Sequence, residues 1–423
     1  MTDKETYDFI IIGSGMGGLL CGTFLSMEGY KVLILEKNQQ IGGSLQVFSR
    51  DKCIFDTGVH FVGSLDENET LYKIFKYAGI YDKLNLHRLD SDCFDLFRFN
   101  NGKSFKMGQG YDKFKDVLYD NFPEETKAID TFCNKIIEIC EFFPLYSLKE
   151  NFYSNLLSDP EILNLNAWDY VNSLTNNKTL RDVLLANGPL YAGEKAYTPF
   201  YVVALITNSY LKGSYRFING GSQIASALSK RIHELGGRIM KHQKVVSIQY
   251  HNNNAVTLTT SKGYTFSALN FISNIHPKQN IALFGEDKFR NAYTKRINNL
   301  EDTVSSFTVY ISFIEDSFPY LNYNIYDYFK DDIWETVNYD DDDEWPTCLF
   351  TCTPVRSNQG KYSDSLTIMT YMNYEEVKKW EKTFNTISEK DQRSEEYEKF
   401  KKLKENQVLD KLEIRFPNIR EKI

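Results

Sequence analysis

The sequence predicts an α/β protein built from two interleaved domains, one with a parallel sheet and one that mixes helices with strands. A strand, a glycine-rich turn, a helix and a second strand follow one another over residues 7–36. A mostly helical stretch with many large apolar side chains follows over 112–211, and strand-and-loop character returns over 215–273. With 423 residues, 42% of them hydrophobic, the chain is long enough for two or three domains.

The first of these stretches has the layout that a dinucleotide requires. The apolar run Phe9–Ile12 leads into the turn Gly13-Ser14-Gly15-Met16-Gly17-Gly18, which opens a helix over 14–29. Gly13 permits the tight turn, Gly15 lets backbone amides approach a pyrophosphate, and Gly18 lets the helix pack close to the strand. The N-terminus of that helix presents N–H groups and the positive end of its dipole to the phosphates.

The second strand of this motif and the glycines after it indicate which dinucleotide is bound. Val32–Leu35 is a buried parallel strand that ends on Glu36, which is placed to accept hydrogen bonds from ribose hydroxyls. Gly42-Gly43-Ser44 follows six residues later and brings a second backbone segment to the pyrophosphate. That second approach is typical of flavoproteins and favours FAD over NAD.

The remaining elements are predicted from apolar periodicity and from turn residues. In chain order we expect extended segments at 45–49 and 53–61, a helix at 70–78, a hairpin joining 93–99 to 104–107 through Asn-Gly, and helices over 112–142 and 161–211. A helix follows at 222–235, then strands at 244–250, 255–260 and 264–268, and a separate buried strand at 269–273. Sheet strands at 305–314 and 366–372 and a charged, helical tail over 374–422 complete the chain.

Composition and charge exclude several classes of function. The formal net charge of −8 argues against a nucleic-acid partner. The acidic cluster Asp340–Glu344 lacks calcium-loop spacing, so we interpret it as a solvated loop and expect no metal site. Seven scattered cysteines form no CxxC pair and suit reduced thiols in a cytoplasm. The apolar run near the N-terminus is too short for a signal peptide or a membrane span, so we expect a soluble or peripheral protein.

Several motifs together resemble one family. Gly13–Gly18, Glu36 and Gly42-Gly43 resemble the amino-terminal signature of the phytoene desaturase-like flavoproteins, which are distant relatives of the amine oxidases. The segment Phe55–His60 resembles the FDTG-x-H element of the retinol saturase and carotenoid isomerase branch. The later segments that resemble this family are Gly220-Gly221-Ser222, Gly236-Gly237, Val245 through Ile248, Ile272-Ser273-Asn274, and the tail from Trp380 to Arg420.

The resemblance implies a Rossmann-type FAD-binding domain interleaved with an α+β substrate (cap) domain, in the architecture of amine oxidases and phytoene desaturases. It places the FAD domain at 1–90 and 212–285 and the cap domain at 91–211 and 286–423. It assigns the FAD contacts to Gly13, Ser14, Gly15, Gly17, Gly18, Glu36, Lys37, Gly42, Gly43, Ser44, Gly58, Val59, His60 and Val245.

Two of these residues carry more specific expectations. The backbone of Val245 is expected to meet the adenine. His60 is expected near the isoalloxazine, where its imidazole would donate a hydrogen bond or move a proton as a catalytic group. The alternative is a structural histidine that shapes its loop.

The expected function follows from the resemblance. It implies an FAD-dependent oxidoreductase that saturates, desaturates or isomerises carbon–carbon double bonds of a hydrophobic polyene, isoprenoid or lipid. A reductase of this kind needs an outside electron source such as NAD(P)H, and the protein would collect its substrate at a membrane surface. The 30 Phe and 28 Tyr suit an apolar ligand tunnel, but ordinary core packing explains them equally well.

Two alternatives to this function stay open. One is an amine-oxidase-like flavoenzyme that acts on a C–N bond. The other is a truncated or non-catalytic flavoprotein. This alternative arises because family members normally continue into a segment that closes the flavin site, and we expect no such stretch after Ile423.

Overall fold

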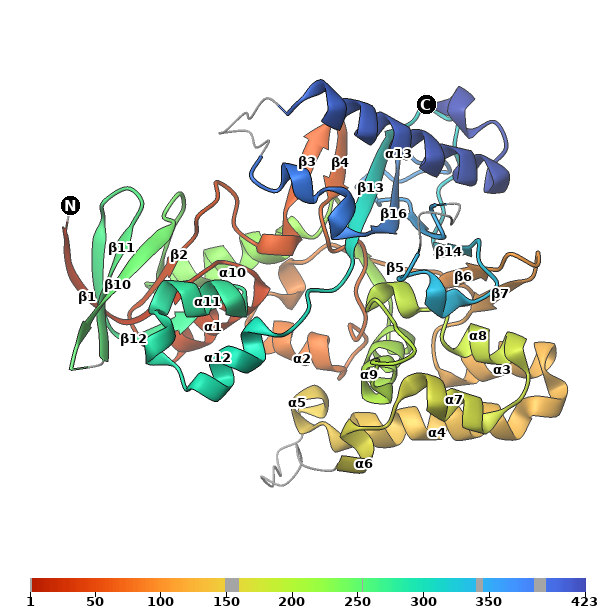
Figure 1. Ribbon diagram of the computed structural model, residues 1–423, viewed down its shortest axis with the longest axis horizontal. Helices are drawn as coiled ribbons and strands as arrows, with labels where there is room; N and C mark the ends of the chain where they lie inside the picture. Colours follow the sequence, from red (N-terminus) through yellow and green to blue (C-terminus); the bar gives the residue numbers. More distant parts are fainter. Residues whose placement is uncertain (1, 149–159, 253, 340–344, 384–392) are drawn as a thin grey trace. The chain divides into compact units, whose positions relative to one another are not determined.

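The computed structural model describes residues 2–148, 160–252, 254–339, 345–383 and 393–423 (Figure 1). These residues form two compact units. Unit 1 contains 1–60, 72–86 and 217–302, and unit 2 contains 61–71, 87–216 and 303–423. The predicted cluster Asp340–Glu344 lies outside the described residues.

Unit 1 is built on a six-stranded sheet with the strand order β10-β11-β12-β1-β2-β9. Its parallel strands are β1 (Thr2–Ile12), β2 (Val32–Leu35), β9 (Arg238–Met240) and β12 (Thr265–Ser273). The antiparallel strands β10 (Val245–His251) and β11 (Asn254–Thr260) extend the sheet beyond β12. All four residues of β2 are buried, as expected for a strand covered on both faces. Tyr7, Ile10, Leu33 and Phe266 belong to the buried hydrophobic core of this sheet.

Helices and short segments complete unit 1. Helix α1 (Met16–Met27) follows the glycine turn and packs against α10 (Ser222–Glu234). The other elements are η1 (Gly43–Leu45), β3 (Val47–Arg50), β4 (Cys53–Asp56), η2 (Tyr81–Lys83), α11 (Pro277–Phe284), η5 (Glu286–Lys288) and α12 (Asn291–Asn298), while α2 (Thr70–Tyr77) begins in unit 2.

Unit 2 is built on a second six-stranded sheet, with the strand order β13-β16-β15-β14-β6-β7. Its strands are β6 (Asp95–Arg98), β7 (Ser104–Met107), β13 (Ser305–Ser312), β14 (Asn324–Tyr328), β15 (Cys348–Cys352) and β16 (Ser365–Met372). The pair β14–β6 is parallel, and the other neighbouring pairs are antiparallel. The predicted Asn-Gly hairpin is therefore confirmed, and it forms the edge β6–β7.

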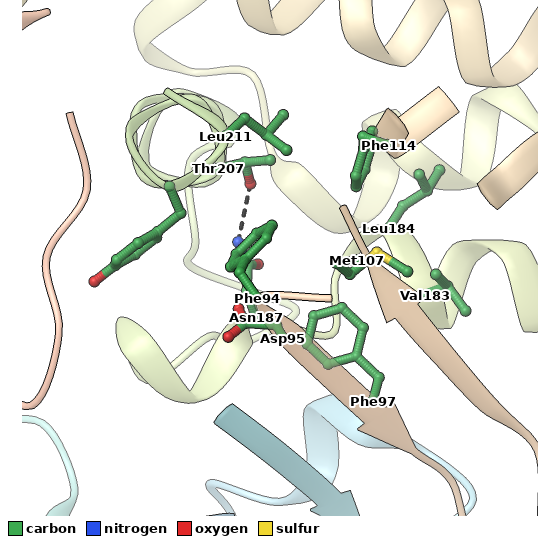
Figure 2. A pocket seen from close by; sticks show the side chains of 11 residues that line it. Phe94, Asp95, Phe97, Met107, Phe114, Val183, Leu184, Asn187, Thr207 and Leu211 are labelled. Carbon is green, nitrogen blue, oxygen red and sulfur yellow. Dashed lines mark hydrogen bonds between the residues drawn. The ribbon is translucent and has the colours of Figure 1, made fainter. Parts of the chain in front are cut away.

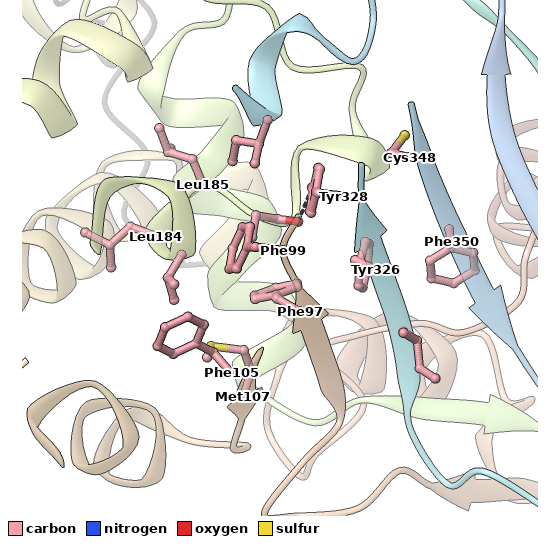
Figure 3. Packing of buried hydrophobic residues seen from close by; sticks show 14 of the residues in the cluster. Phe97, Phe99, Phe105, Met107, Leu184, Leu185, Tyr326, Tyr328, Cys348 and Phe350 are labelled. Carbon is pink, nitrogen blue, oxygen red and sulfur yellow. Dashed lines mark hydrogen bonds between the residues drawn. The ribbon is translucent and has the colours of Figure 1, made fainter. Parts of the chain in front are cut away.

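Aromatic side chains fill the core of unit 2 (Figure 3). Phe99 stacks on Tyr328 with ring centroids 5.7 Å apart, and Phe97 meets Tyr326 edge-on at 5.2 Å. Each such ring pair contributes about 1 kcal/mol of stability beyond the hydrophobic burial of its surface. Ordinary core packing therefore accounts for many of the aromatic residues.

Helices pack around this core, and α4 (Thr126–Phe142) packs against α9 (Phe200–Leu211). The remaining elements are α3 (Tyr111–Asn121), η3 (Pro123–Glu125), α5 (Pro144–Ser147), α6 (Pro160–Leu163), α7 (Ala167–Leu174), α8 (Lys178–Leu184), η4 (Gly188–Leu190), η6 (Ile333–Glu335), η7 (Tyr374–Glu376), η8 (Lys378–Trp380), α13 (Glu395–Arg415) and η9 (Ile419–Lys422), with short strands β5 (Leu86–Arg88) and β8 (Tyr215–Phe217). No helix in the part of the chain that the structure describes is long and apolar enough to cross a bilayer.

The structure corrects the sequence prediction at several strands. The two strands predicted at 264–268 and 269–273 are one continuous strand, β12, which pairs with β1 along its length. Its second half is not buried, since Leu269 is 70% exposed. The strands β9, β14 and β15 were not predicted. The last two are buried at every position and so lack the alternation that marks a half-exposed strand.

Candidate functional site

The glycine turn after β1 is held by backbone contacts at two of its glycines. Gly13 has φ +96°, and a Cβ there would lie 2.8 Å from the carbonyl oxygen of Asn274. A Cβ on Gly18 would lie 2.2 Å from the carbonyl oxygen of Gly13. No side chain fits at that distance, so the fold itself requires glycine at both positions.

Gly15 differs from these two residues. Its φ of −62° suits any residue, and the nearest atom to a Cβ there is Nδ2 of Asn274 at an ordinary 3.4 Å. Gly15 is the N-cap of α1, and no side chain caps this helix end. A side chain at position 15 would therefore meet no close neighbour beside the N-terminal end of α1, and helix N-termini of this kind are suited to bind an anion.

Glu36 lies at the end of β2 and faces the glycine turn. Its Oε2 accepts hydrogen bonds from the N–H (3.0 Å) and the hydroxyl (2.6 Å) of Ser14, and its Oε1 accepts one from the N–H of Asn38 (2.8 Å). The residue is only 6% exposed. A carboxylate has about four lone-pair sites, so these three bonds leave room for a ribose hydroxyl. The predicted ribose contact stays a prediction, and the Ser14 contact was not predicted.

The second glycine segment lies directly against the first. The N–H of Gly42 donates to the carbonyl oxygen of Ser14 (2.9 Å), and a Cβ on Gly43 would lie 3.2 Å from Cα of Gly15. Both glycines have positive φ, +108° and +58°. The structure thus brings Gly42, Gly43 and the start of Ser44 to the same end of α1, where the sequence analysis expected a second approach to the pyrophosphate.

The segment after β4 joins these two glycine segments to a third. A Cβ on Gly58 would lie 3.0 Å from Cβ of Ser44, so this turn packs against η1. Asp56 Oδ1 accepts a hydrogen bond from the N–H of Gly221 (2.7 Å) and lies 3.0 Å from the Cβ position of Gly220. Asp56 therefore connects the resembling segments 55–60 and 220–222, a role that the sequence analysis did not assign to it. We call the assembly of 13–18, 42–44, 56–58 and 220–221 the glycine cradle.

The segment before β10 runs along the end of β2. The N–H of Glu36 donates to the carbonyl oxygen of Met240 (2.9 Å), and the N–H of Gln243 donates to the carbonyl oxygen of Glu36 (2.7 Å). Val245 follows two residues later and is partly buried against the unit 1 core. Lys37, next to Glu36, is exposed. The segment that leads to Val245 thus passes beside Glu36, and the contact of both residues with the cofactor stays a prediction.

His60 is the last residue of the first segment of unit 1, and it is partly buried. The neighbouring Val59 lies beside Gly221, because a Cβ there would be 3.6 Å from the Val59 carbonyl oxygen. These contacts place the loop at the glycine cradle. They do not test whether the imidazole takes part in the reaction, so a catalytic role for His60 stays a prediction.

The structure adds Asn274, which the sequence analysis treated only as the end of a strand. Its N–H donates to the carbonyl oxygen of Ile12 (2.8 Å). Its side-chain amide lies over the start of α1, with Oδ1 3.1 Å from the Cβ position of Gly17 and Nδ2 3.1 Å from that of Gly18. Its position directly after a strand could have indicated this role, because the carboxyl ends of parallel strands lie at the same edge of the sheet as the glycine turn.

Comparison with known proteins agrees with this geometry. A family model described as flavin containing amine oxidoreductase matches residues 16–407. All-trans-retinol 13,14-reductase of Danio rerio is 27% identical over 280 residues, which are 61% of this chain and 45% of that protein. Prolycopene isomerase 2, chloroplastic, of an Oncidium hybrid cultivar is 29% identical over 286 residues, 64% of this chain and 49% of that protein. The chain spans less than half the length of these curated relatives.

Solved structures show the same fold at low sequence identity. A crystal structure of a Pyrococcus furiosus protein has a TM-score of 0.60 and 17% identity, and the match covers 90% of this chain and 82% of that one. Cyclohexylamine oxidase from Brevibacterium oxydans has a TM-score of 0.58 and 13% identity over 97% of this chain and 81% of that one. At these identities the likeness concerns the fold alone.

Proposed function

Because this chain belongs to the flavin containing amine oxidoreductase family, we propose that its glycine cradle binds FAD and that the protein is an FAD-dependent oxidoreductase. Its substrates would be hydrophobic polyenes, isoprenoids or lipids, whose carbon–carbon double bonds it saturates, desaturates or isomerises. The proposal for the substrate rests on the reductases and isomerases whose sequences it matches, which are named for retinol and prolycopene.

The observation that carries the FAD assignment is the room at Gly15. The fold needs glycine at Gly13 and Gly18, but it does not need it at Gly15, where the backbone is relaxed and a Cβ would meet no close neighbour. A glycine that the fold does not require, beside uncapped N–H groups, supports an approaching anion. In this proposal the N–H groups of α1 bind the pyrophosphate, and Glu36 binds the ribose.

FAD bound in this cradle would supply hydride transfer, which is chemistry that no side chain provides. The protein's own residues would then hold the cofactor in place and exclude water from the bound substrate. Ser14 and Asn38 orient the Glu36 carboxylate, and Asp56 holds the third glycine segment in place. Buried hydrogen bonds of this kind keep a binding site in shape before its ligand arrives.

The test uses purified protein incubated with FAD and freed from excess cofactor. We expect a bound flavin spectrum, and under anaerobic conditions we expect polyenes such as retinol or prolycopene to change the redox state of the oxidised or chemically reduced flavin. Protein that takes up no FAD would contradict the proposal. Bound flavin that shows no spectral change with any polyene, and polyenes that are recovered without saturation, desaturation or isomerisation, would leave the cofactor assignment standing and overturn the substrate class.

The second candidate is oxidation of a C–N bond, which the match to the flavin containing amine oxidoreductase family favours. This candidate predicts a different result with the same flavin-loaded protein. Amines would bleach the bound flavin anaerobically, and in air the protein would release hydrogen peroxide. If polyenes change the flavin spectrum and amines do not, this candidate is excluded.

Two further parts of the proposal concern partners. A saturation reaction consumes reducing equivalents, so we propose NAD(P)H or a protein that carries its electrons as the donor. We also propose that the protein meets its apolar substrate at a membrane surface. Anaerobic addition of NADPH to the flavin-loaded protein tests the first, and co-sedimentation with lipid vesicles tests the second.

A further inference from the structure

A small cavity inside unit 2 is too narrow for a substrate (Figure 2). Asp95, Asn187 and Thr207 line it on one side, and Phe97 and Phe114 lie on the other. Its volume, counted as the space open to the centre of a water molecule, is about 20 Å³, which is room for one water. A partner larger than water must bind elsewhere, and the charges on the surface indicate where.

The two units differ in charge. Unit 1 contains 19 Lys and Arg residues against 13 Asp and Glu residues, a formal net charge of +6. Unit 2 contains 30 Lys and Arg residues against 44 Asp and Glu residues, a net charge of −14. The two units together have the net charge of −8 of the whole chain, so an acidic average hides a basic unit. Such an asymmetry is typical of proteins in which one part meets an anionic partner.

Four exposed lysines of unit 1 lie together at the carboxyl end of β2. The N–H of His242 donates to the carbonyl oxygen of Asn38 (3.2 Å), and the N–H of Ser261 donates to the carbonyl oxygen of Lys244 (2.8 Å). These backbone hydrogen bonds join the three segments that carry the lysines. We call the four residues the basic patch, which consists of Lys37, Lys241, Lys244 and Lys262.

The basic patch presents positive charge that is not neutralised by a neighbouring acid. Among the residues that the structure describes, none of its four lysines forms an ion pair. Elsewhere in unit 1, by contrast, Lys76 pairs with Asp82 at 2.7 Å. Glu36 lies beside the patch, but it is buried and both of its carboxylate oxygens accept hydrogen bonds. The four charges of the patch therefore face the solvent together.

The segment that carries Lys241 and Lys244 is anchored in the interior of unit 1. Gln243 between them is 5% exposed, and its N–H donates to the carbonyl oxygen of Glu36 (2.7 Å). Its Oε1 accepts a hydrogen bond from the hydroxyl of Thr260 (2.8 Å). Val246 follows at an irregularity of β10, and its side chain is 48% exposed. A fixed surface thus carries an apolar side chain next to the lysines.

We propose that the basic patch docks unit 1 on a membrane that contains anionic lipids. The lysines bind the charged head groups, and Val246 contacts the apolar region beneath them. Charges are screened beyond about 8 Å at physiological salt, so the charges nearest the lipid decide the interaction rather than the net charge of the chain. This inference rests on the membrane contact in the proposed function and deepens it, because it names the surface and the lipid class.

An acidic protein would match the charge of the patch equally well. The lipid surface is favoured by two observations. The exposed Val246 beside the lysines suits a partner that has anionic groups above an apolar layer. The substrates of the proposed function are apolar, and a membrane is where such molecules collect.

The experiment sediments the whole protein with vesicles of phosphatidylcholine alone and with vesicles in which about a third of the lipid is phosphatidylserine. We expect binding to the anionic vesicles only, and we expect added salt to weaken it because salt screens the charges. Equal binding to both kinds of vesicle would keep the membrane contact and overturn the basic patch as its surface. Binding to neither kind would overturn both and leave an acidic protein as the partner of the patch.

Two triple variants test the residues. A lysine near an anionic surface raises membrane partitioning about fivefold, so loss of three should lower partitioning to anionic vesicles roughly a hundredfold. The patch variant combines Lys241→Gln, Lys244→Gln and Lys262→Gln, and it keeps Lys37 because that residue is a predicted FAD contact. The matched control combines three exposed lysines of unit 2, in Lys103→Gln, Lys127→Gln and Lys361→Gln.

The control has the same net charge as the patch variant and should bind anionic vesicles like the parent protein. Equal losses in the two variants would show that net charge decides and would overturn the proposal. Flavin uptake, measured on the same samples, separates docking from the cofactor assignment. Protein that takes up FAD but does not distinguish the two kinds of vesicle contradicts the docking proposal alone. Protein that binds anionic vesicles through the patch but takes up no FAD contradicts the FAD assignment alone.

Discussion

The two units of this protein are specified in opposite ways. The glycine cradle of unit 1 depends on side chains that are absent, since Gly13 and Gly18 have backbone oxygens where a Cβ would lie. The core of unit 2 depends on side chains that are large, such as Phe97, Phe99 and Tyr326. The first unit brings backbone segments into close contact at these glycines, whereas the second fills its interior with aromatic side chains. Substitutions should therefore act differently in the two units.

The largest effect is expected in unit 1 at Gly18. In Gly18→Ala the new Cβ meets the Gly13 carbonyl oxygen, which is backbone and cannot rotate away. We expect a loss of about 3 kcal/mol or more in the free energy of unfolding. The matched control is Gly15→Ala, where the nearest atom is 3.4 Å away and the loss should stay below about 1 kcal/mol. Equal losses, measured by denaturant unfolding, would contradict the distinction between structural and cofactor glycines.

A smaller effect in unit 2 concerns pH. Burial raises the pKa of Asp95 to about 7, against the opposing influence of Asn324 and Arg216, from an ordinary value of 3.8. A carboxyl with a raised pKa in the folded state contributes stability below pH 3.8, and this contribution is lost as the pH rises through about 7. The neighbouring Tyr210 and Tyr326 stay neutral, because burial raises the pKa of both phenols.

The measurement compares Asp95→Asn with the parent protein at several pH values. The variant does not titrate at this position, so its stability relative to the parent should improve between pH 4 and 7, by up to roughly 3 kcal/mol. Thermal or denaturant unfolding of both proteins gives the difference. A difference that is constant over this pH range would show that Asp95 does not titrate there.

The smallest expected effects distinguish two tyrosines of β14 in the unit 2 core. The hydroxyl of Tyr328 donates to the carbonyl oxygen of Ala186 (2.6 Å), whereas the buried hydroxyl of Tyr326 has no hydrogen-bond partner among the described residues. Tyr328→Phe should cost about 1 kcal/mol, and Tyr326→Phe should be neutral or stabilising by up to about 1 kcal/mol. Matching losses in chemical denaturation would mean that the Tyr326 hydroxyl is satisfied, for example by water.

The same contrast explains what the sequence could predict. The glycine turn was readable because its glycines stand between a predicted strand and a predicted helix, with Glu36 at the end of the next strand. Strands β14 and β15 were missed because they are short and buried throughout, with Tyr, Asp and Cys among their residues. A pattern of this kind shows neither the alternation of a half-exposed strand nor the continuous aliphatic run seen in β2.

The contacts that could not be predicted come from distant segments. Asn274 reaches the glycine turn only because β12 pairs in parallel with β1. Asp56 meets Gly221 across 165 residues of sequence. The network of Asp95, Asn324 and Arg216 joins three strands, and none of these residues belongs to a motif. The role of such a polar residue can be recognised only when the structure shows which residue it contacts.

The central claim is that Gly15 is glycine for the cofactor and not for the fold, and it is tested most directly by FAD binding to Gly15→Val. The variant is titrated with FAD, and binding is followed by the change in flavin fluorescence, alongside its circular dichroism spectrum and melting temperature. We expect a folded protein, destabilised by about 1 kcal/mol or less, that no longer binds FAD because the side chain occupies the place of the pyrophosphate. A folded variant that binds FAD as tightly as the parent would contradict it.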